Sequence, residues 1–189
     1  MNIFALHRNP VLAAQSVCDT HSSKMTLETM QMLASAAIRH GATPKQLPLT
    51  DKGTPYKGGY HNHPCTVWAG DTRANYEWLC WHGIALSEEF YQRFGKHHSC
   101  SPKIIQMCGL THLIPEGDLT PFARAIKKDT YPDLLDTDVF PNTVVAYRIF
   151  YILDKRSFAT WNHGAKAPSW WNADLVFPKN KQEQMEMII

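Results

Sequence analysis

Features that would place this sequence in a specialised class of protein are largely absent from it. No stretch approaches the ~20 apolar residues that a membrane-spanning helix needs. The segment 1–6 has neither the charged start nor the long apolar run of a secretion signal. We therefore expect a cytoplasmic protein that has no membrane partner.

The cysteine content and the charge balance each argue against one class of protein. The five cysteines are an odd number and follow no signal peptide, which argues against a framework of disulfide bonds. The net charge of +2, from 19 Lys and Arg against 17 Asp and Glu, is not that of a strongly basic nucleic-acid-binding protein. A local basic patch stays open, because residues 1–60 contain six Lys or Arg and three Asp or Glu.

Repeats, low-complexity tracts and strand-like alternation are also lacking, whereas 44% of the residues are apolar, enough for one core. We expect an all-α fold, a compact single domain over residues 1–189 with about four to five helices. Long loops are expected at 42–64 and 96–141, and a short strand is possible by pattern at 3–6. Capping residues, prolines and apolar spacing predict helices at 10–17, 19–40, 72–94, 120–128 and 143–161.

The most informative segment begins at Cys18. His21, Lys24 and Glu28 are spaced so that a helix carries all three on one face. Glu28 lies among apolar neighbours, and burial of a carboxyl group suits it to general acid–base chemistry. Asp19 precedes them as a candidate substrate contact. The alternative is that Lys24 and Glu28 form a surface ion pair and that His21 bonds to Asp19.

A second polar segment runs from His61 to Lys96. His63 ends a loop rich in Gly and Pro, and Arg73 and Asn75 lie in the first turns of an expected helix, where main-chain N–H groups favour a phosphate. Zinc is the competing interpretation, with Cys18, His21, His63 and Cys65 as candidate ligands. Because no repeated Cys-x-x-Cys spacing occurs, buried free cysteines and hydrogen-bonded histidines are favoured over a metal site, and no cofactor is expected.

The third group lies near the end of the chain. Arg148 and Lys155 are seven residues apart, on one face of the last expected helix, next to Tyr147 and the aromatic residue Trp170. A basic face beside aromatic rings can hold phosphates and stack on a base. The alternative is a solvated face over an aromatic core.

The run Asp19-x-His21, followed by Glu28 seven residues after the histidine, resembles the phage pyrimidine-dimer DNA glycosylases of the endonuclease V type. A turn led by His63, a long helix ending at Gly95 and an aromatic tail at Trp170 are similar to that family too. The chain also resembles uncharacterised phage and bacterial proteins that share Cys-Asp-x-His-x-x-Lys-Met. A phage-encoded protein would act in the cytoplasm of the host cell.

The resemblance implies a small all-helical enzyme whose N-terminal amine attacks the sugar of a damaged nucleotide with assistance from a glutamate. An α-amine is a usable nucleophile near neutral pH, because its reference pKa is about 7.7–8.0. The family exposes a small residue after methionine removal, whereas Asn2 is bulky, so the amine expected here is that of Met1. Catalytic roles then fall to Met1, Glu28 and His21.

The sequence therefore predicts an enzyme that processes a DNA base, with double-stranded DNA carrying a damaged or modified base as its partner. Base flipping would bring that base into a pocket. A glycosylase, with or without a lyase step, is the favoured form. Two alternatives stay open: a transferase that modifies a base or nucleotide on the same scaffold, and a phage protein that binds a nucleotide or a protein without catalysis.

Overall fold

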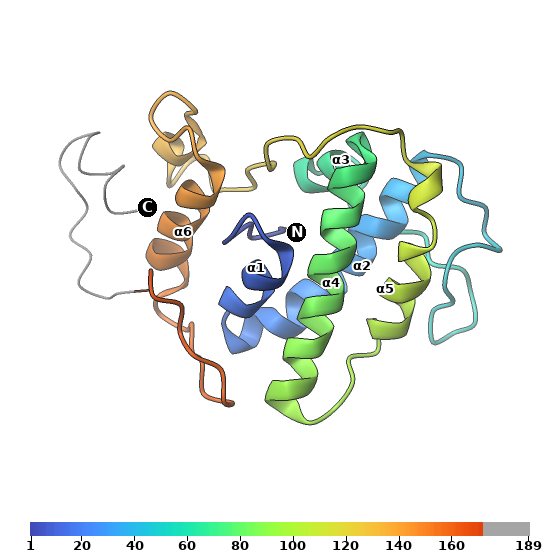
Figure 1. Cartoon of the computed structure of the whole chain (residues 1–189), viewed down its shortest axis with the longest axis horizontal. Helices are drawn as coiled ribbons and strands as arrows, with labels where there is room; N and C mark the ends of the chain where they lie inside the picture. Colours follow the sequence, from blue (N-terminus) through green and yellow to red (C-terminus); the bar gives the residue numbers. More distant parts are fainter. Residues whose placement is uncertain (172–189) are drawn as a thin grey trace.

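Six α-helices and two short 3-10 helices form the part of the chain that the computed structural model describes, residues 1–171 (Figure 1). The all-α prediction is confirmed, since a single Leu49–Pro55 bridge is the whole of the β-structure in that range. The helices are α1 (Pro10–Ser16), α2 (Asp19–Arg39), α3 (Pro64–Asp71), α4 (Arg73–Phe94), α5 (Ser101–Cys108), η1 (Thr111–Leu113), η2 (Pro132–Leu135) and α6 (Thr143–Lys155).

The two long helices α2 and α4 pack on each other and form the centre of the fold, with α1, α3 and α5 around them (Figure 1). Their approach is close at Gly83, where an added Cβ would lie 2.7 Å from Thr29 Cγ2. Local signals set the ends of α4. The Thr72 side chain accepts a hydrogen bond from Asn75 N at the start, and Gly95, in the left-handed conformation at φ +65, ends the helix.

Several expected boundaries are wrong. The loop expected at 42–64 is present, but α3 follows it unexpectedly, because His63 caps a helix with Pro64 at its first position. The expected irregular region 96–141 contains α5, η1 and η2. The last helix ends at Lys155 rather than near residue 161, and residues 3–6 form no strand, because the chain turns at Phe4, whose φ is +38.

The helix expected at 120–128 does not form, and the reason lies in Asn75. Its side chain accepts a hydrogen bond from Thr120 N at 2.9 Å and donates to Thr120 Oγ1 at 2.8 Å. The threonine that was expected to cap a helix is therefore held by another element, and the chain beyond it runs extended. Tertiary hydrogen bonds have replaced a local capping preference.

The N-terminal segment, residues 1–6, lies between α6 and the helices α1–α5 (Figure 1). Phe4 contacts His21 of α2 on one side and Phe150 and Tyr151 of α6 on the other. Residues 2–6 are all buried. None of the helices in the described part of the chain has the length and apolarity that a membrane crossing requires.

Candidate active site

The N-terminal amine and the Glu28 carboxylate form the centre of the candidate site. Met1 N lies 3.8 Å from Glu28 Oε2, and the Asn2 main-chain N–H donates to the same oxygen at 2.7 Å. The Glu28 side chain is 11% exposed. The Met1 side chain is fully buried although the residue is not, so the accessible part of Met1 is its main chain. The pair therefore joins a reachable amine to a carboxylate that is largely protected from water.

Three side-chain contacts hold the amine in this place. Thr66 Oγ1 of α3 donates to Met1 Sδ at 3.2 Å. Asn2 Nδ2 donates to Ala125 O at 2.8 Å, and Asn2 Oδ1 accepts from Phe4 N at 2.9 Å. Asn2 is thus a buried residue with both ends of its amide bonded, and the position of the amine is fixed from two sides.

Lys24 lies beside the Glu28 carboxylate, and His63 is close enough to the N-terminal amine to feel its charge. Lys24 Nζ is 3.9 Å from Glu28 Oε1, and its side chain is 61% exposed. His63 caps α3 through a hydrogen bond from Cys65 N. Burial, and then the positive charge of the N-terminal amine, lower the pKa of His63. His63 therefore lies within electrostatic reach of the amine.

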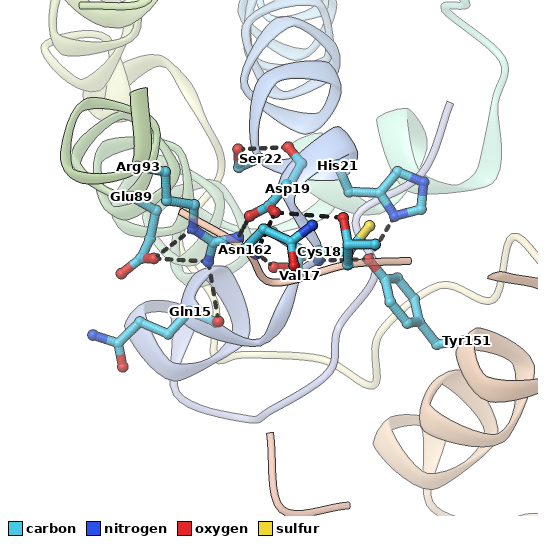
Figure 2. A network of polar contacts seen from close by, with 11 residues as sticks. Gln15, Val17, Cys18, Asp19, His21, Ser22, Glu89, Arg93, Tyr151 and Asn162 are labelled. Carbon is cyan, nitrogen blue, oxygen red and sulfur yellow. Dashed lines mark hydrogen bonds and ion pairs between the residues drawn. The ribbon is translucent and has the colours of Figure 1, made fainter. Parts of the chain in front are cut away.

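His21 shares a helix face with Glu28 but does not touch it, since seven residues of helix correspond to about 10 Å. Its Nδ1 lies 2.6 Å from the Tyr151 hydroxyl, which also accepts from Cys18 N at 3.0 Å (Figure 2). Burial, and then the charges of Lys155 and Lys24, lower the pKa of His21 to about 3. The ring is therefore neutral near neutral pH, accepts the Tyr151 proton at Nδ1 and carries its own hydrogen on Nε2.

The neutral His21 ring acts as a platform for the N-terminal segment. Phe4 stacks on it with ring centroids 4.7 Å apart and an interplanar angle of 22°. Phe4 adopts φ +38, a conformation that costs energy for a residue with a bulky side chain. The contacts of Phe4 with the surrounding rings hold the chain in this strained turn. The turn directs residues 1–3 along α2 toward Glu28.

Asp19 is a structural residue at the start of α2. Its carboxylate accepts from Asn162 N at 2.7 Å and from Arg93 Nη1 at 3.4 Å (Figure 2). Arg93 also donates to the Val17 carbonyl and to the Glu89 carboxylate, each at 2.8 Å. The expected role of Asp19 as a substrate contact is untested, and its contacts show that it joins the start of α2 to α4 and to the segment at Thr160 and Asn162.

Arg73 and Asn75, expected to bind a phosphate, lie away from the amine. Arg73 Nη1 forms an ion pair with Glu116 Oε1 at 2.8 Å. Asn75 is fully buried, and its amide bonds to Trp68 O as well as to Thr120. Arg73 Nε is buried without a hydrogen-bond partner in the described part of the chain, whereas both ends of the Asn75 amide are bonded.

The third predicted group divides into a buried part and a half-buried part. Tyr147 is buried, with its hydroxyl bonded to Ala123 O and Ala125 N. Lys155 Nζ lies 2.6 Å from Asp154 Oδ2 and 5.6 Å from the Phe4 ring centre. Arg148 donates from Nε to Leu6 O at 2.9 Å, and its guanidinium lies 5.5 Å from the ring centre of half-buried Trp170.

A metal site does not form from the residues that were candidates for it. Within residues 1–171, no three His, Cys, Asp or Glu side chains gather as ligands, so Cys18, His21, His63 and Cys65 do not make a zinc centre. Cys65 is buried 4.0 Å from the Tyr147 hydroxyl, and burial raises its pKa to about 11. The alternative of buried free cysteines and hydrogen-bonded histidines describes them better.

Sequence reasoning missed the residues that position the amine. These are Asn2, Phe4, Thr66 and Tyr151. Asn2 carried a usable signal, because it is the one polar residue in the segment 1–6 and a buried polar side chain needs partners. Tyr151 is 130 residues from His21, and nothing in the linear pattern joins them.

No protein-family model matches the chain, and comparison with curated proteins and with solved structures gives no match. The resemblance to pyrimidine-dimer glycosylases therefore remains a prediction, and the geometry of the site has to carry the functional argument.

Proposed function

We propose that the protein is a DNA glycosylase with an associated lyase step, in which the Met1 amine is the nucleophile and Glu28 its acid–base partner. The observation that supports the proposal is the 3.8 Å separation of Met1 N and Glu28 Oε2. An amine and a carboxylate at this separation are within reach of a small adjustment to hydrogen-bonding distance. The partner would be duplex DNA with a damaged or modified base turned out of the helix.

The proposed chemistry needs no group beyond these two and the substrate. The free amine attacks the sugar C1′, the bond from C1′ to the base breaks, and the base leaves with the electron pair and takes up a proton. Glu28 accepts the proton that the amine loses, and the sugar ring opens as O4′ is protonated and an imine forms between C1′ and the Met1 nitrogen. Loss of a proton from C2′ then expels the 3′ phosphate, which is the lyase step.

The other residues of the site have supporting roles in this proposal. Lys24, exposed beside Glu28, would contact a phosphate next to the extruded nucleotide. His21 and Tyr151 are positioning residues, because they act through Phe4 on the N-terminal segment. The proposal requires that the mature chain begin at Met1, and N-terminal sequencing of the purified protein tests this requirement directly.

Borohydride trapping is the decisive experiment. Duplexes carrying ultraviolet photoproducts, uracil or hypermodified phage pyrimidines are incubated with the protein and sodium borohydride. We expect a covalent adduct with at least one of them, and mass spectrometry should place it on the Met1 nitrogen. A protein whose first residue is preceded by Gly-Ser should form none. The absence of both adduct and released base across the panel would contradict the proposal.

A matched pair of variants separates catalysis from stability. Glu28→Gln removes the carboxylate beside the amine, and we expect turnover to fall by about 10²- to 10⁴-fold, the range for general acid–base groups, with DNA binding retained. Glu89→Gln is the control, since Glu89 is also a partly buried member of an i,i+4 ion pair on a helix. Equal losses in the two variants would refute the role of Glu28.

The same assays distinguish the two alternative functions. A gain in the mass of the DNA without release of a base would indicate a transferase. Tight binding of a nucleotide or protein that survives Glu28→Gln, with no turnover of any substrate, would indicate a binding protein.

A further inference from the structure

A cavity that does not include Met1 or Glu28 lies between the N-terminal segment and the start of α6. It has a volume of about 460 Å³, within the range of small-molecule sites. One wall is the first turn of α6 with Asn142 and Thr143, and another is the extended chain at 119–122. Arg8 and Arg148 supply its charged side chains, and His7 lines it as well. No Asp or Glu is among the described residues that line it.

Among residues 1–171, no carboxylate neutralises the positive charge in this cavity. Arg8 is exposed, and within residues 1–171 its guanidinium makes no hydrogen bond or ion pair. Within the same residues, Arg148 donates a single hydrogen bond, from Nε to Leu6 O. Burial lowers the pKa of Arg148. Burial, and then the charge of Arg148, lower the pKa of His7, which places these two residues within electrostatic reach of each other. A half-buried cation without a counter-ion is costly unless an anion can reach it.

The α6 wall adds to this charge. The first turn of a 13-residue helix presents main-chain N–H groups with partial positive charge. Arg124 lies behind that turn and donates to Thr143 Oγ1 at 3.3 Å. The remaining lining is apolar and aromatic, with Phe122 between two prolines, Pro121 and Pro141. Such a surface fits a sugar or base attached to the anion.

We propose that this cavity binds the phosphate of a nucleotide unit, with Arg8 and Arg148 as its cationic contacts and the first turn of α6 as its N–H donor. The identity of that unit as part of the substrate DNA rests on the proposed function, whereas anion binding itself does not. His7 is six residues from Met1, so the cavity lies within about 20 Å of the amine along the chain. That distance corresponds to about six base pairs of B-DNA, so one duplex can reach both sites.

The test compares two cavity variants with a surface control. Arg8→Gln removes one cation while the Arg8 carbonyl keeps its bond from Trp78 Nε1. Thr143→Asp places a carboxylate in the cavity at a helix start, where an acidic residue is well tolerated. Lys45→Gln is the control, in an exposed loop at the far end of the molecule from α6 (Figure 1). Unfolding by urea checks that each variant is folded.

Binding of the full-length protein to an undamaged labelled duplex is measured between 50 and 200 mM salt (about the range over which phosphate contacts dominate). We expect Arg8→Gln to weaken binding roughly five- to tenfold and to reduce the slope of log K against log salt by about 0.9. Thr143→Asp should weaken it at least as much, and Lys45→Gln should leave both quantities unchanged. In a second arm, pyrophosphate and a nucleoside diphosphate are titrated alone by tryptophan fluorescence.

Loss of duplex affinity confined to the cavity variants supports a backbone phosphate as the ligand. Binding of the small phosphates that both cavity variants abolish supports a free nucleotide. The proposal is overturned if neither variant changes duplex binding and no small phosphate binds, or if Lys45→Gln weakens binding equally. Borohydride trapping tests the amine independently of the cavity. If the protein forms the covalent adduct but Arg8→Gln leaves its affinity for DNA unchanged, only the cavity proposal is refuted.

Discussion

Arg93→Met should destabilise the fold more than any surface charge substitution, because Arg93 is a buried cation that connects three helices. Its side chain is 1% exposed. It donates to the Val17 and Gln15 carbonyls at the end of α1, to Asp19 of α2 and to Glu89 of its own helix. Methionine has similar volume but no donor group, so two carbonyls and two carboxylates, those of Asp19 and Glu89, would lose their bonds from Arg93.

Breaking a buried ion pair by removing one partner costs about 3–5 kcal/mol. Asp19 keeps its bond from Asn162 N at 2.7 Å, which favours the lower end, and we expect a loss of about 3 kcal/mol in the free energy of unfolding. With a urea m-value of about 2 kcal/mol/M, the midpoint should fall by about 1.5 M. Urea denaturation followed by circular dichroism measures this shift.

Arg73→Met is the matched control. Arg73 also forms an arginine–glutamate pair at 2.8 Å, but its partner Glu116 is 82% exposed. An exposed pair contributes about 0–1 kcal/mol, so the midpoint should move by less than about 0.5 M. If both variants shift the midpoint equally, the assignment of Arg93 as the connection between the three helices is refuted.

Three further predictions concern the core. Gly83→Ala should lower the free energy of unfolding by about 1–3 kcal/mol, because the added Cβ would lie 2.7 Å from Thr29 Cγ2 and force α2 and α4 apart. An unchanged midpoint in urea denaturation would show that the two helices adjust freely. Burial lowers the pKa of His82 to about 3, below its unfolded value of about 6.5, so the stability it supports is present above pH 6.5 and lost as pH falls toward 3. The free energy of unfolding should therefore fall by about 2 kcal/mol less between pH 7 and pH 5 in His82→Phe than in the unmodified protein. An unchanged pH dependence would contradict this. Iodoacetamide should alkylate Cys108 before the other four cysteines, because those four are buried and a hydrogen bond from Cys80 lowers the pKa of Cys108. Mass spectrometry of peptides measures the order of alkylation.

The sequence predicts those helices whose ends are set by residues adjacent in the chain. Asn9 and Asn142 cap α1 and α6 through their own side chains, and Gly95 ends α4, as expected. The eight-residue helices α3 and α5 were missed because a helix of two turns has too few apolar positions to show a period. The region around Thr120 was misjudged because its partner, Asn75, is 45 residues away.

The candidate site divides in the same way. The common face of His21 and Glu28 follows from helical spacing alone. The arrangement of the amine depends on contacts such as Asn2 with Ala125, 123 residues apart, and His21 with Tyr151, 130 apart. No local pattern encodes such pairs, so the sequence could suggest Met1 as a nucleophile but could not place it beside Glu28.

The long-range contacts of the N-terminal segment have a consequence for how the protein is made. Residues 1–6 leave the ribosome first, yet Leu6 is held by Arg148, 142 residues later, and Phe4 by rings of α6. Until α6 has been synthesised, Met1 and Asn2 have Thr66 and Glu28 as partners, but Phe4 and Leu6 lack their contacts with α6. A chain released before residue 155 should therefore fold its central helices while residues 1–6 lack their contacts with α6, and the arrangement of Met1 beside Glu28 would be complete only after α6 has been made.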